Sequence, residues 1–157
     1  MSDNSSASLH TWLVMMKAHQ AIVRYILADL EETGLGASDF QVLEVLLHKG
    51  PLPVNVIGPK VNLTPGSISV AVDRLVAKGL VSRVESASDR RIRMVELTPH
   101  GKSVIKPIFK AHVATIEKIF AKLSQKEIKQ LEQSLRSIGL EAEELLKHSD
   151  AEGQSKK

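Results

Sequence analysis

The stretch that decides the fold is "LTPGSISVAVDRLVAKGL", residues 63–80. Thr64 followed by Pro65 predicts the start of a helix. The threonine oxygen can cap the first turn, and the N–H that proline lacks would have no partner within the helix at that position. One face of the expected helix is apolar and contains Ile68, Val72, Leu75 and Val76. Gly79 then ends it. The stretch therefore predicts a short, capped helix with one buried face.

A second short helix is expected immediately before it, in "PVNVIGPKVNL", residues 53–63. Two helices joined by a tight turn form a helix-turn-helix, in which the second helix can enter a DNA major groove. Gly58-Pro59 interrupts the first of them, because proline lacks an N–H and disfavours a helical residue before it. We therefore expect that helix to be distorted or to start late.

Two strands are expected after the capped helix, at Val81–Glu85 and Arg93–Leu97, where apolar and polar residues alternate. A hairpin in this position is typical of a wing. The polar loop between the strands, Ser86–Ile92, carries Asp89-Arg90-Arg91.

The loop arginines indicate DNA contact. An arginine suits a narrow minor groove, where negative potential is concentrated, and a neighbouring carboxylate can hold its guanidinium in place. We interpret Arg91 as a minor-groove probe, Asp89 as its holder, and Arg90 and Arg93 as phosphate anchors. A solvated charged turn is the alternative.

The capped helix supplies the other candidate DNA-binding residues: Thr64, Pro65, Gly66, Ser67, Ser69, Val70 and Arg74. Its N-terminal N–H groups suit a phosphate. The two serines can bond bases or phosphates, Val70 can touch a thymine methyl, and Arg74 can bind a guanine edge or a phosphate. An ordinary exposed helix face is the alternative for Ser67, Ser69 and Arg74.

Long helices are expected at both ends of the chain. Leu9 to about Thr33 is mostly apolar, after a polar tail at residues 1–8 that we expect to be disordered. Ser38–Gln41 matches a capping box that opens a helix burying Phe40. Thr98-Pro99 opens another long helix, and Ser124–Glu127 is a second capping box. The last helix has a heptad seam made of Ile128, Leu131, Leu135, Ile138, Ala142 and Leu145.

These terminal helices favour a homodimer, because both have more apolar surface than a monomer's exterior accommodates. Packing within one chain is the alternative. The predicted fold is mainly α with a small β-hairpin wing. It is a single unit over residues 9–147, with a winged helix-turn-helix at 38–98, dimerisation helices at 9–34 and 100–147, and a frayed tail at 148–157.

Composition excludes several classes of protein. The 157 residues carry a net charge of +3, and from Arg74 to Arg93 six residues are basic and two acidic. Aromatic residues are only 3%, too few for a single-strand stacking platform, and the absence of cysteine excludes disulfides and thiolate chemistry. We see no signal peptide, no membrane-spanning run and no catalytic motif. We expect a cytoplasmic, non-enzymatic protein without a cofactor.

Two segments resemble the MarR family of bacterial winged-helix regulators: "LTPGSISVAVDRLVAKGLVSR" at 63–83 and "DRRIRMVELTPHG" at 89–101. The resemblance covers about residues 9–147 in element order. It implies a homodimer on a pseudo-palindromic operator in double-stranded DNA, commonly released by a small, often anionic aromatic ligand. It also implies that Arg91 enters the minor groove, held by Asp89. The sequence departs from the family at "VIGPKV", where a regular helix is usual.

A ligand site between the dimerisation and DNA-binding parts is a further hypothesis. In the expected architecture its lining is Met16, His19, Phe40, Leu43 and His112. Buried packing is the more common role for such residues. The scattered histidines form no convincing metal-ligand set, although a metal-responsive regulator stays an alternative. A winged-helix module that binds an acidic protein partner is another.

Overall fold

The computed structural model describes residues 3–85 and 93–154. The chain divides into two compact units, Met1–Ile116 and Glu117–Lys157. The predicted wing-tip residues Asp89, Arg90 and Arg91 lie outside the described residues. None of the described helices is long and apolar enough to cross a membrane.

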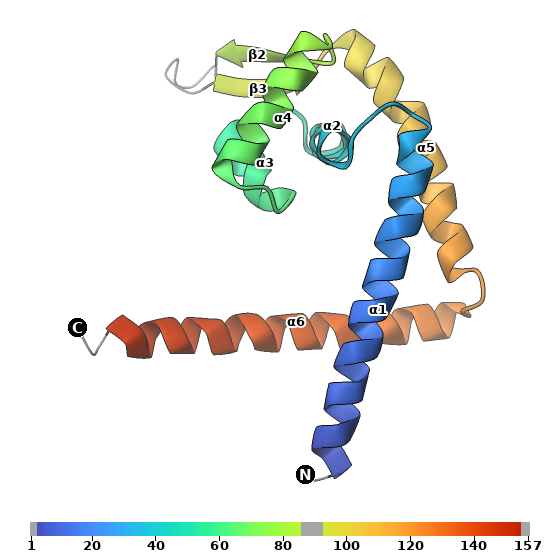
Figure 1. The fold of residues 1–157 in the computed structure, drawn as a ribbon. Coiled ribbons are helices and arrows are strands. Elements are labelled where there is room, and N and C mark those ends of the chain that lie inside the picture. Colours follow the sequence, from blue (N-terminus) through green and yellow to red (C-terminus); the bar gives the residue numbers. More distant parts are fainter. Residues whose placement is uncertain (1–2, 86–92, 155–157) are drawn as a thin grey trace. The chain divides into compact units, whose positions relative to one another are not determined.

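The first unit is mostly helical (Figure 1). Its elements are α1 (Asp3–Glu31), α2 (Ala37–Lys49), β1 (Leu52–Pro53), α3 (Val54–Lys60), α4 (Pro65–Ala77), β2 (Val81–Glu85), β3 (Arg93–Leu97) and most of α5 (Pro99–Phe120). This order confirms the predicted winged helix-turn-helix. Residues 3–8, expected to be a disordered tail, are instead the first turns of α1.

The wing is the predicted antiparallel hairpin, with both strand bounds as expected. Val81 pairs with Leu97 and Glu85 pairs with Arg93. The sheet also has a third strand that the sequence did not suggest: β1 pairs with β3, giving the order β1-β3-β2. Pro53 is tolerated there because β1 is an edge strand, where a proline breaks no inner ladder.

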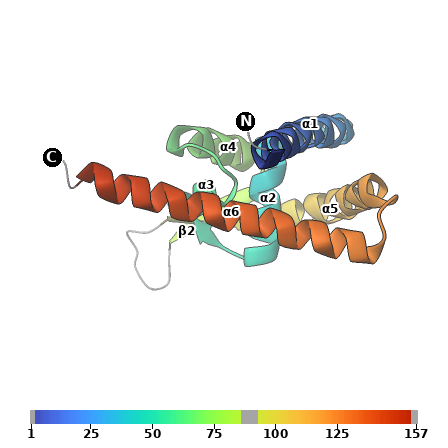
Figure 2. The ribbon, with the colours of Figure 1, turned by 90° about the horizontal axis from the view of Figure 1, so that it is seen from below.

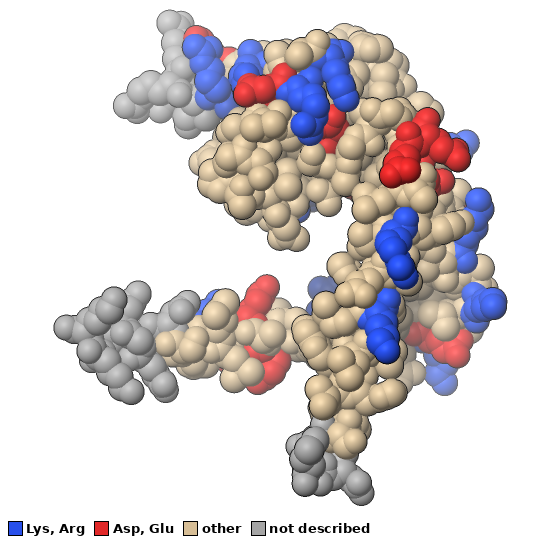
Figure 3. Space-filling view, in the orientation of Figure 1, with Lys and Arg blue, Asp and Glu red and all other residues tan. Residues whose placement is uncertain are grey.

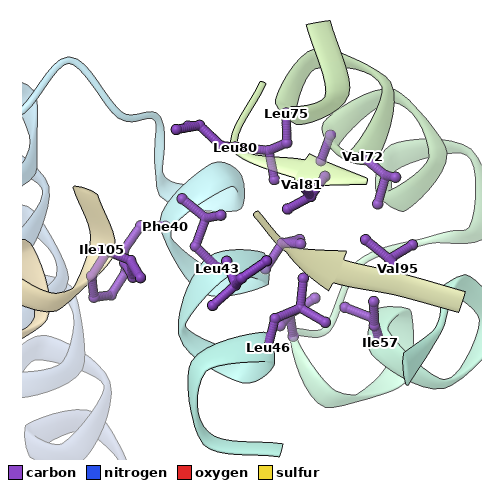
Figure 4. Packing of buried hydrophobic residues seen from close by; sticks show 14 of the residues in the cluster. Phe40, Leu43, Leu46, Ile57, Val72, Leu75, Leu80, Val81, Val95 and Ile105 are labelled. Atoms are coloured by element: carbon purple, nitrogen blue, oxygen red, sulfur yellow. The ribbon is translucent and has the colours of Figure 1, made fainter. Parts of the chain in front are cut away.

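The core lies where α2, α3 and α4 pack against the sheet (Figure 4). It contains Ile68, Ala71, Val72 and Leu75 of α4, Leu43 and Leu46 of α2, Ile57 of α3, and Val81 and Val95 of the strands. Val76, predicted to belong to the buried face of α4, is instead 37% exposed, and Ala71 lies in the core. Ile105 extends the core to α5. Phe40 and Leu43, predicted to line a ligand site, are both buried in this cluster.

The start of α2 differs from the prediction. The helix begins at Ala37 with Gly36 as its N-cap, and no side chain caps it. Ser38 is therefore inside the first turn, so the predicted Ser38–Gln41 capping box is wrong. The Ser38 hydroxyl instead accepts a hydrogen bond from Arg74 Nη2, at 3.0 Å.

Gly58-Pro59 affects the end of α3 rather than its start. The helix begins at Val54 and stops one residue after Pro59, and Asn62 follows with a φ of 54°. A Cβ on Gly58 would lie 3.3 Å from the Leu63 carbonyl oxygen and 3.4 Å from Ile68 Cγ2. The glycine therefore allows α3 to approach α4 closely.

A tight joint connects the wing to α5. Thr98 caps α5 by accepting from the Gly101 N–H at 2.9 Å, as Thr98-Pro99 predicted. The same hydroxyl donates to the carbonyl of Gly79, and the Thr98 N–H donates to that of Leu80. Farther along α5, the buried Thr115 donates to Asp29 of α1 at 2.9 Å.

The second unit contains the end of α5 and α6 (Gln125–Gln154), which is one uninterrupted helix in Figures 1 and 2. The predicted capping box is present: Ser124 donates its N–H and hydroxyl to Glu127, at 2.8 and 2.6 Å. The helix continues past His148, where fraying was expected. Its seam is solvent-exposed in the single chain, with Leu135 43% and Leu145 61% exposed.

Candidate nucleic-acid interface

The interface is built on α4, the second helix of the helix-turn-helix. Thr64 caps it as predicted, accepting the Ser67 N–H at 3.2 Å, with Pro65 in the first turn. Ile68, Ala71, Val72 and Leu75 face the core. Because these buried residues fix which face of the helix packs inward, the opposite face is presented to solvent.

That exposed face carries the predicted DNA-binding residues of the helix: Gly66, Ser67, Ser69, Val70 and Arg74. Nothing lies within 4 Å of a Cβ built on Gly66, so the chain's own packing does not require a glycine there. The Ser69 hydroxyl donates to the Pro65 carbonyl at 2.9 Å. The Ser67 oxygen accepts from the Thr64 hydroxyl, which leaves the Ser67 hydroxyl proton available for a partner.

Arg74 has an intramolecular partner that the sequence did not reveal. Its Nε donates to both carboxylate oxygens of Asp39, at 2.8 and 3.0 Å, and its Nη2 donates to Oδ1 and to Ser38. Lys78 Nζ donates to Asp39 Oδ2 at 3.1 Å. Asp39 is only 1% exposed, whereas the side chains of Arg74 and Lys78 are 43% and 39% exposed. Asp39 is therefore a buried anion bridging α2 and α4.

The pKa of Asp39 reflects two opposed effects. Burial raises it, but the hydrogen bonds from Arg74 and Lys78 and their positive charges outweigh burial and hold it below its usual range. The hydrogen bond to Asp39 raises the pKa of Arg74. The network is therefore ionised at neutral pH.

Acid should weaken this network. Because the pKa of Asp39 is lower in the folded than in the unfolded chain, its contribution to the free energy of unfolding is present above about pH 4 and is lost as the pH falls through the folded value. We expect the stability difference between wild type and Asp39→Asn to shrink as the pH falls below about 4. Urea unfolding across this range measures it. A difference that does not change with pH would contradict the assignment.

The described basic residues of the wing are also paired. Arg83 of β2 forms an ion pair with Asp73 of α4. Across the hairpin, Arg93 Nη1 lies 3.1 Å from Glu85 Oε1. In Figure 3, acidic and basic side chains are mixed over the part of the first unit that carries α4 and the strands. Arg93, predicted to anchor a phosphate, is thus an exposed arginine at the loop end of the hairpin, with a carboxylate beside it.

A cavity of about 650 Å³ lies beside α4. Its lining comes from α3, the following turn and the first turns of α4, and includes Val54, Pro59, Leu63, Ile68 and Ser69. Arg93 is its charged lining residue. The sequence did not indicate it, because its walls come from segments whose apolar residues also suit core packing.

The residues predicted to bind a ligand are only partly brought together. The rings of Phe40 and His112 lie 4.8 Å apart, and the buried Nδ1 of His112 has no hydrogen-bond partner among the described residues. Leu43 is fully buried, as the packing alternative expects. His19 is exposed on α1 and lines a separate depression with Gln20 and Val23, while Met16 is half-buried. Within residues 3–85 and 93–154, no group of three or more His, Asp or Glu side chains is placed to hold a metal ion.

Comparison with known proteins agrees with this geometry. A family model described as the MarR family matches residues 33–92. The HTH-type transcriptional regulator MhqR of Bacillus subtilis (strain 168) is 34% identical over 137 residues, which cover 87% of this chain and 94% of MhqR.

Solved structures of similar fold include a DNA complex and a ligand complex. Sco3205, a MarR family regulator from Streptomyces coelicolor in complex with DNA, is 22% identical over 85% of this chain and 86% of its own, with a TM-score of 0.76. CouR from Rhodococcus jostii RHA1, bound to p-coumaroyl-CoA, is 22% identical over 80% of this chain and 88% of its own, with a TM-score of 0.72. The fold, the capped helix with its wing and the match to MhqR together show that this chain belongs to the MarR family of DNA-binding transcriptional regulators.

Proposed function

We propose that this regulator binds a pseudo-palindromic operator as a homodimer in the cytoplasm, represses transcription by occluding the promoter, and is released by a small anionic aromatic ligand. The exposed apolar seam of α6 is the observation that carries the dimer. A two-fold dimer presents two copies of α4 to successive major grooves, about 34 Å apart. An inverted repeat is the DNA sequence that such a symmetric protein reads.

The assigned DNA contacts are of two kinds: contacts to phosphates, which position the protein on the duplex, and contacts to base edges, which read the sequence. The N–H groups at the start of α4, around Thr64 and Pro65, suit a phosphate. Ser67 has a hydroxyl proton available for a base or phosphate acceptor, and Val70 is an exposed apolar residue suited to a thymine methyl. Arg90 and Arg93 are assigned to phosphates, and Arg91 with Asp89 to the minor groove.

Selection of binding sites from random duplex DNA by the purified protein tests the proposal. We expect recovery of an inverted repeat whose half-sites are about one helical turn apart. Recovery of a single, unrepeated motif would contradict the dimer. A protein that binds no duplex even at low salt would favour an acidic protein partner instead, since phosphate contacts strengthen as salt falls.

Arg91→Ala should weaken operator binding by about 1–3 kcal/mol, because a minor-groove arginine adds both electrostatic and shape-dependent affinity. Mobility-shift titration at one fixed salt concentration measures the loss. Arg136→Ala is the matched control, since it removes an exposed arginine that is paired with Glu132 within α6. Equal affinities for Arg91→Ala and Arg136→Ala would remove the role assigned to Arg91.

Ligand release rests on the Phe40–His112 contact, where a buried, unpartnered ring nitrogen lies against an aromatic ring. Such a pair suits an aromatic ligand with a polar group. A ligand releases DNA when it binds better to a dimer whose two α4 helices are wrongly spaced. Salicylate-like acids, titrated against the operator complex beside an aliphatic acid of equal charge, test this. No release by any aromatic acid would indicate a regulator without such a ligand.

A further inference from the structure

Asp39 holds Arg74 of α4, the recognition helix of the helix-turn-helix, and Lys78 at its C-cap, with both of its carboxylate oxygens. Arg74 Nε reaches both oxygens, and Lys78 Nζ reaches Oδ2. Arg74 and Lys78 are four residues apart, so they lie one above the other on the same side of α4. The buried residues Ile68, Val72 and Leu75 already fix which face of α4 packs inward. The two polar contacts, one turn apart, add a link from the C-terminal end of α4 to the first turn of α2.

The ends of the two helices favour this arrangement. Asp39 is in the first turn of α2, where a negative charge is stabilised, and Arg74 and Lys78 are at the C-terminal end of α4, where positive charges are stabilised. Asp39 is 1% exposed, so it would lose part of its charge compensation if one cation left for a DNA phosphate, and it would be a buried, uncompensated anion if both left. The charge balance of Asp39 therefore favours keeping both cations paired with it.

From this geometry we propose that Asp39 is a positioning residue for DNA recognition: it sets the orientation of α4 through Arg74 and Lys78, and it withholds those two cations from phosphates. The proposal rests on the DNA-binding function. It replaces the role predicted for Arg74, a direct base or phosphate contact, with an indirect one. The consequence is selectivity, because unpaired cations strengthen binding to every DNA sequence alike.

Asp39→Asn tests this by releasing the cations while keeping the side-chain size. We expect stronger binding to random duplex, with a salt slope steeper by about 0.9 for each cation that reaches a phosphate. Operator binding should not gain equally, so the operator-to-random affinity ratio should fall by about tenfold or more. Titrations at several salt concentrations, with operator from the selection and a shuffled duplex, measure both quantities.

Two variants separate charge from position. Asp39→Glu keeps the charge, so it should keep the wild-type salt slope. Glu132→Gln makes the same charge change on α6 and should leave the affinity ratio unchanged. If Asp39→Asn weakened both DNAs equally with an unchanged slope, Asp39 would be merely structural and the proposal would fail.

Lys78→Gln keeps the test decisive if Asp39→Asn does not fold, because Lys78 is on the surface and Arg74 still compensates Asp39. We expect its salt slope on random duplex to equal that of wild type. A slope shallower by about 0.9 would show that Lys78 contacts a phosphate, and the proposal would be wrong. Failure of wild type to bind any duplex would instead overturn the proposed function.

Discussion

Gly101→Ala should destabilise the first unit severely. A Cβ at this position would lie 1.9 Å from the Leu80 carbonyl oxygen, 2.8 Å from its carbonyl carbon and 3.2 Å from its Cα. All three atoms belong to the backbone, so no side chain can rotate away to relieve the clash. We expect the free energy of unfolding to fall by about 3 kcal/mol or more, at the upper end of overpacking penalties.

The clash falls on the joint between the wing and α5. Leu80 accepts the Thr98 N–H at 3.1 Å, and Thr98 in turn caps α5 through the Gly101 N–H. A methyl group that pushes Leu80 away therefore also disturbs the cap and the start of β2. We therefore expect Gly101→Ala to weaken DNA binding as well as to lower the free energy of unfolding.

Thermal unfolding at a fixed protein concentration measures the effect, which should appear as a fall in Tm of roughly 10 °C. Gly139→Ala is the matched control, because nothing lies within 4 Å of a Cβ built there and Gly139 is inside α6. Alanine should raise the stability of that helix by up to about 1 kcal/mol. If Gly101→Ala unfolded at the wild-type temperature, the joint would have to relax far more easily than its backbone contacts indicate.

Local signals predicted the wing and the recognition helix well. The helix start at Thr64-Pro65 depends only on neighbouring residues, and the two strands after Gly79 are indicated by alternating apolar and polar residues. The third strand, β1, was missed for the same reason. It is two residues long, and its partner Val95 is more than forty residues away in the chain. No local pattern distinguishes such a strand from a loop.

The start of α2 shows how a local signal can mislead. Ser38 and Gln41 have the spacing of a capping box, but the chain already turns into the helix at Gly36. The tertiary partner Arg74 then takes the Ser38 hydroxyl. Residues 3–8 were predicted to be disordered but are helical, since a helix that is already nucleated extends at little cost per residue.

The Asp39 network was also outside the reach of local reasoning. Arg74 was interpreted as an exposed DNA-binding residue and Lys78 was only counted among the basic residues, while their shared partner is 35 residues or more away in the chain. One available signal was their spacing of four residues beside the buried Leu75, which places both near the α4 face that packs inward. The wing-tip residues stay predictions, because they lie outside the described residues.

Leu135→Glu should abolish most operator binding without touching the DNA-binding elements. Leu135 is in the middle of the α6 seam and is 43% exposed in the single chain. Dimer formation as proposed would bury it, and burying an unpaired carboxylate is costly. A protein reduced to one half-site loses the effective concentration supplied by its partner, so we expect operator affinity to fall by about 10²–10⁴-fold.

Gln133→Glu is the control, because it adds the same charge on the same helix at a position outside the heptad seam. Sedimentation equilibrium and mobility-shift titration of both variants separate the two possibilities. A Leu135→Glu protein that is monomeric and binds a single half-site about as well as wild type does would support the seam as the dimer interface, since its α4 would remain intact. If it instead remained dimeric with full operator affinity, the α6 seam would not be the dimer interface. The exposed leucines of α6 would then make some other contact.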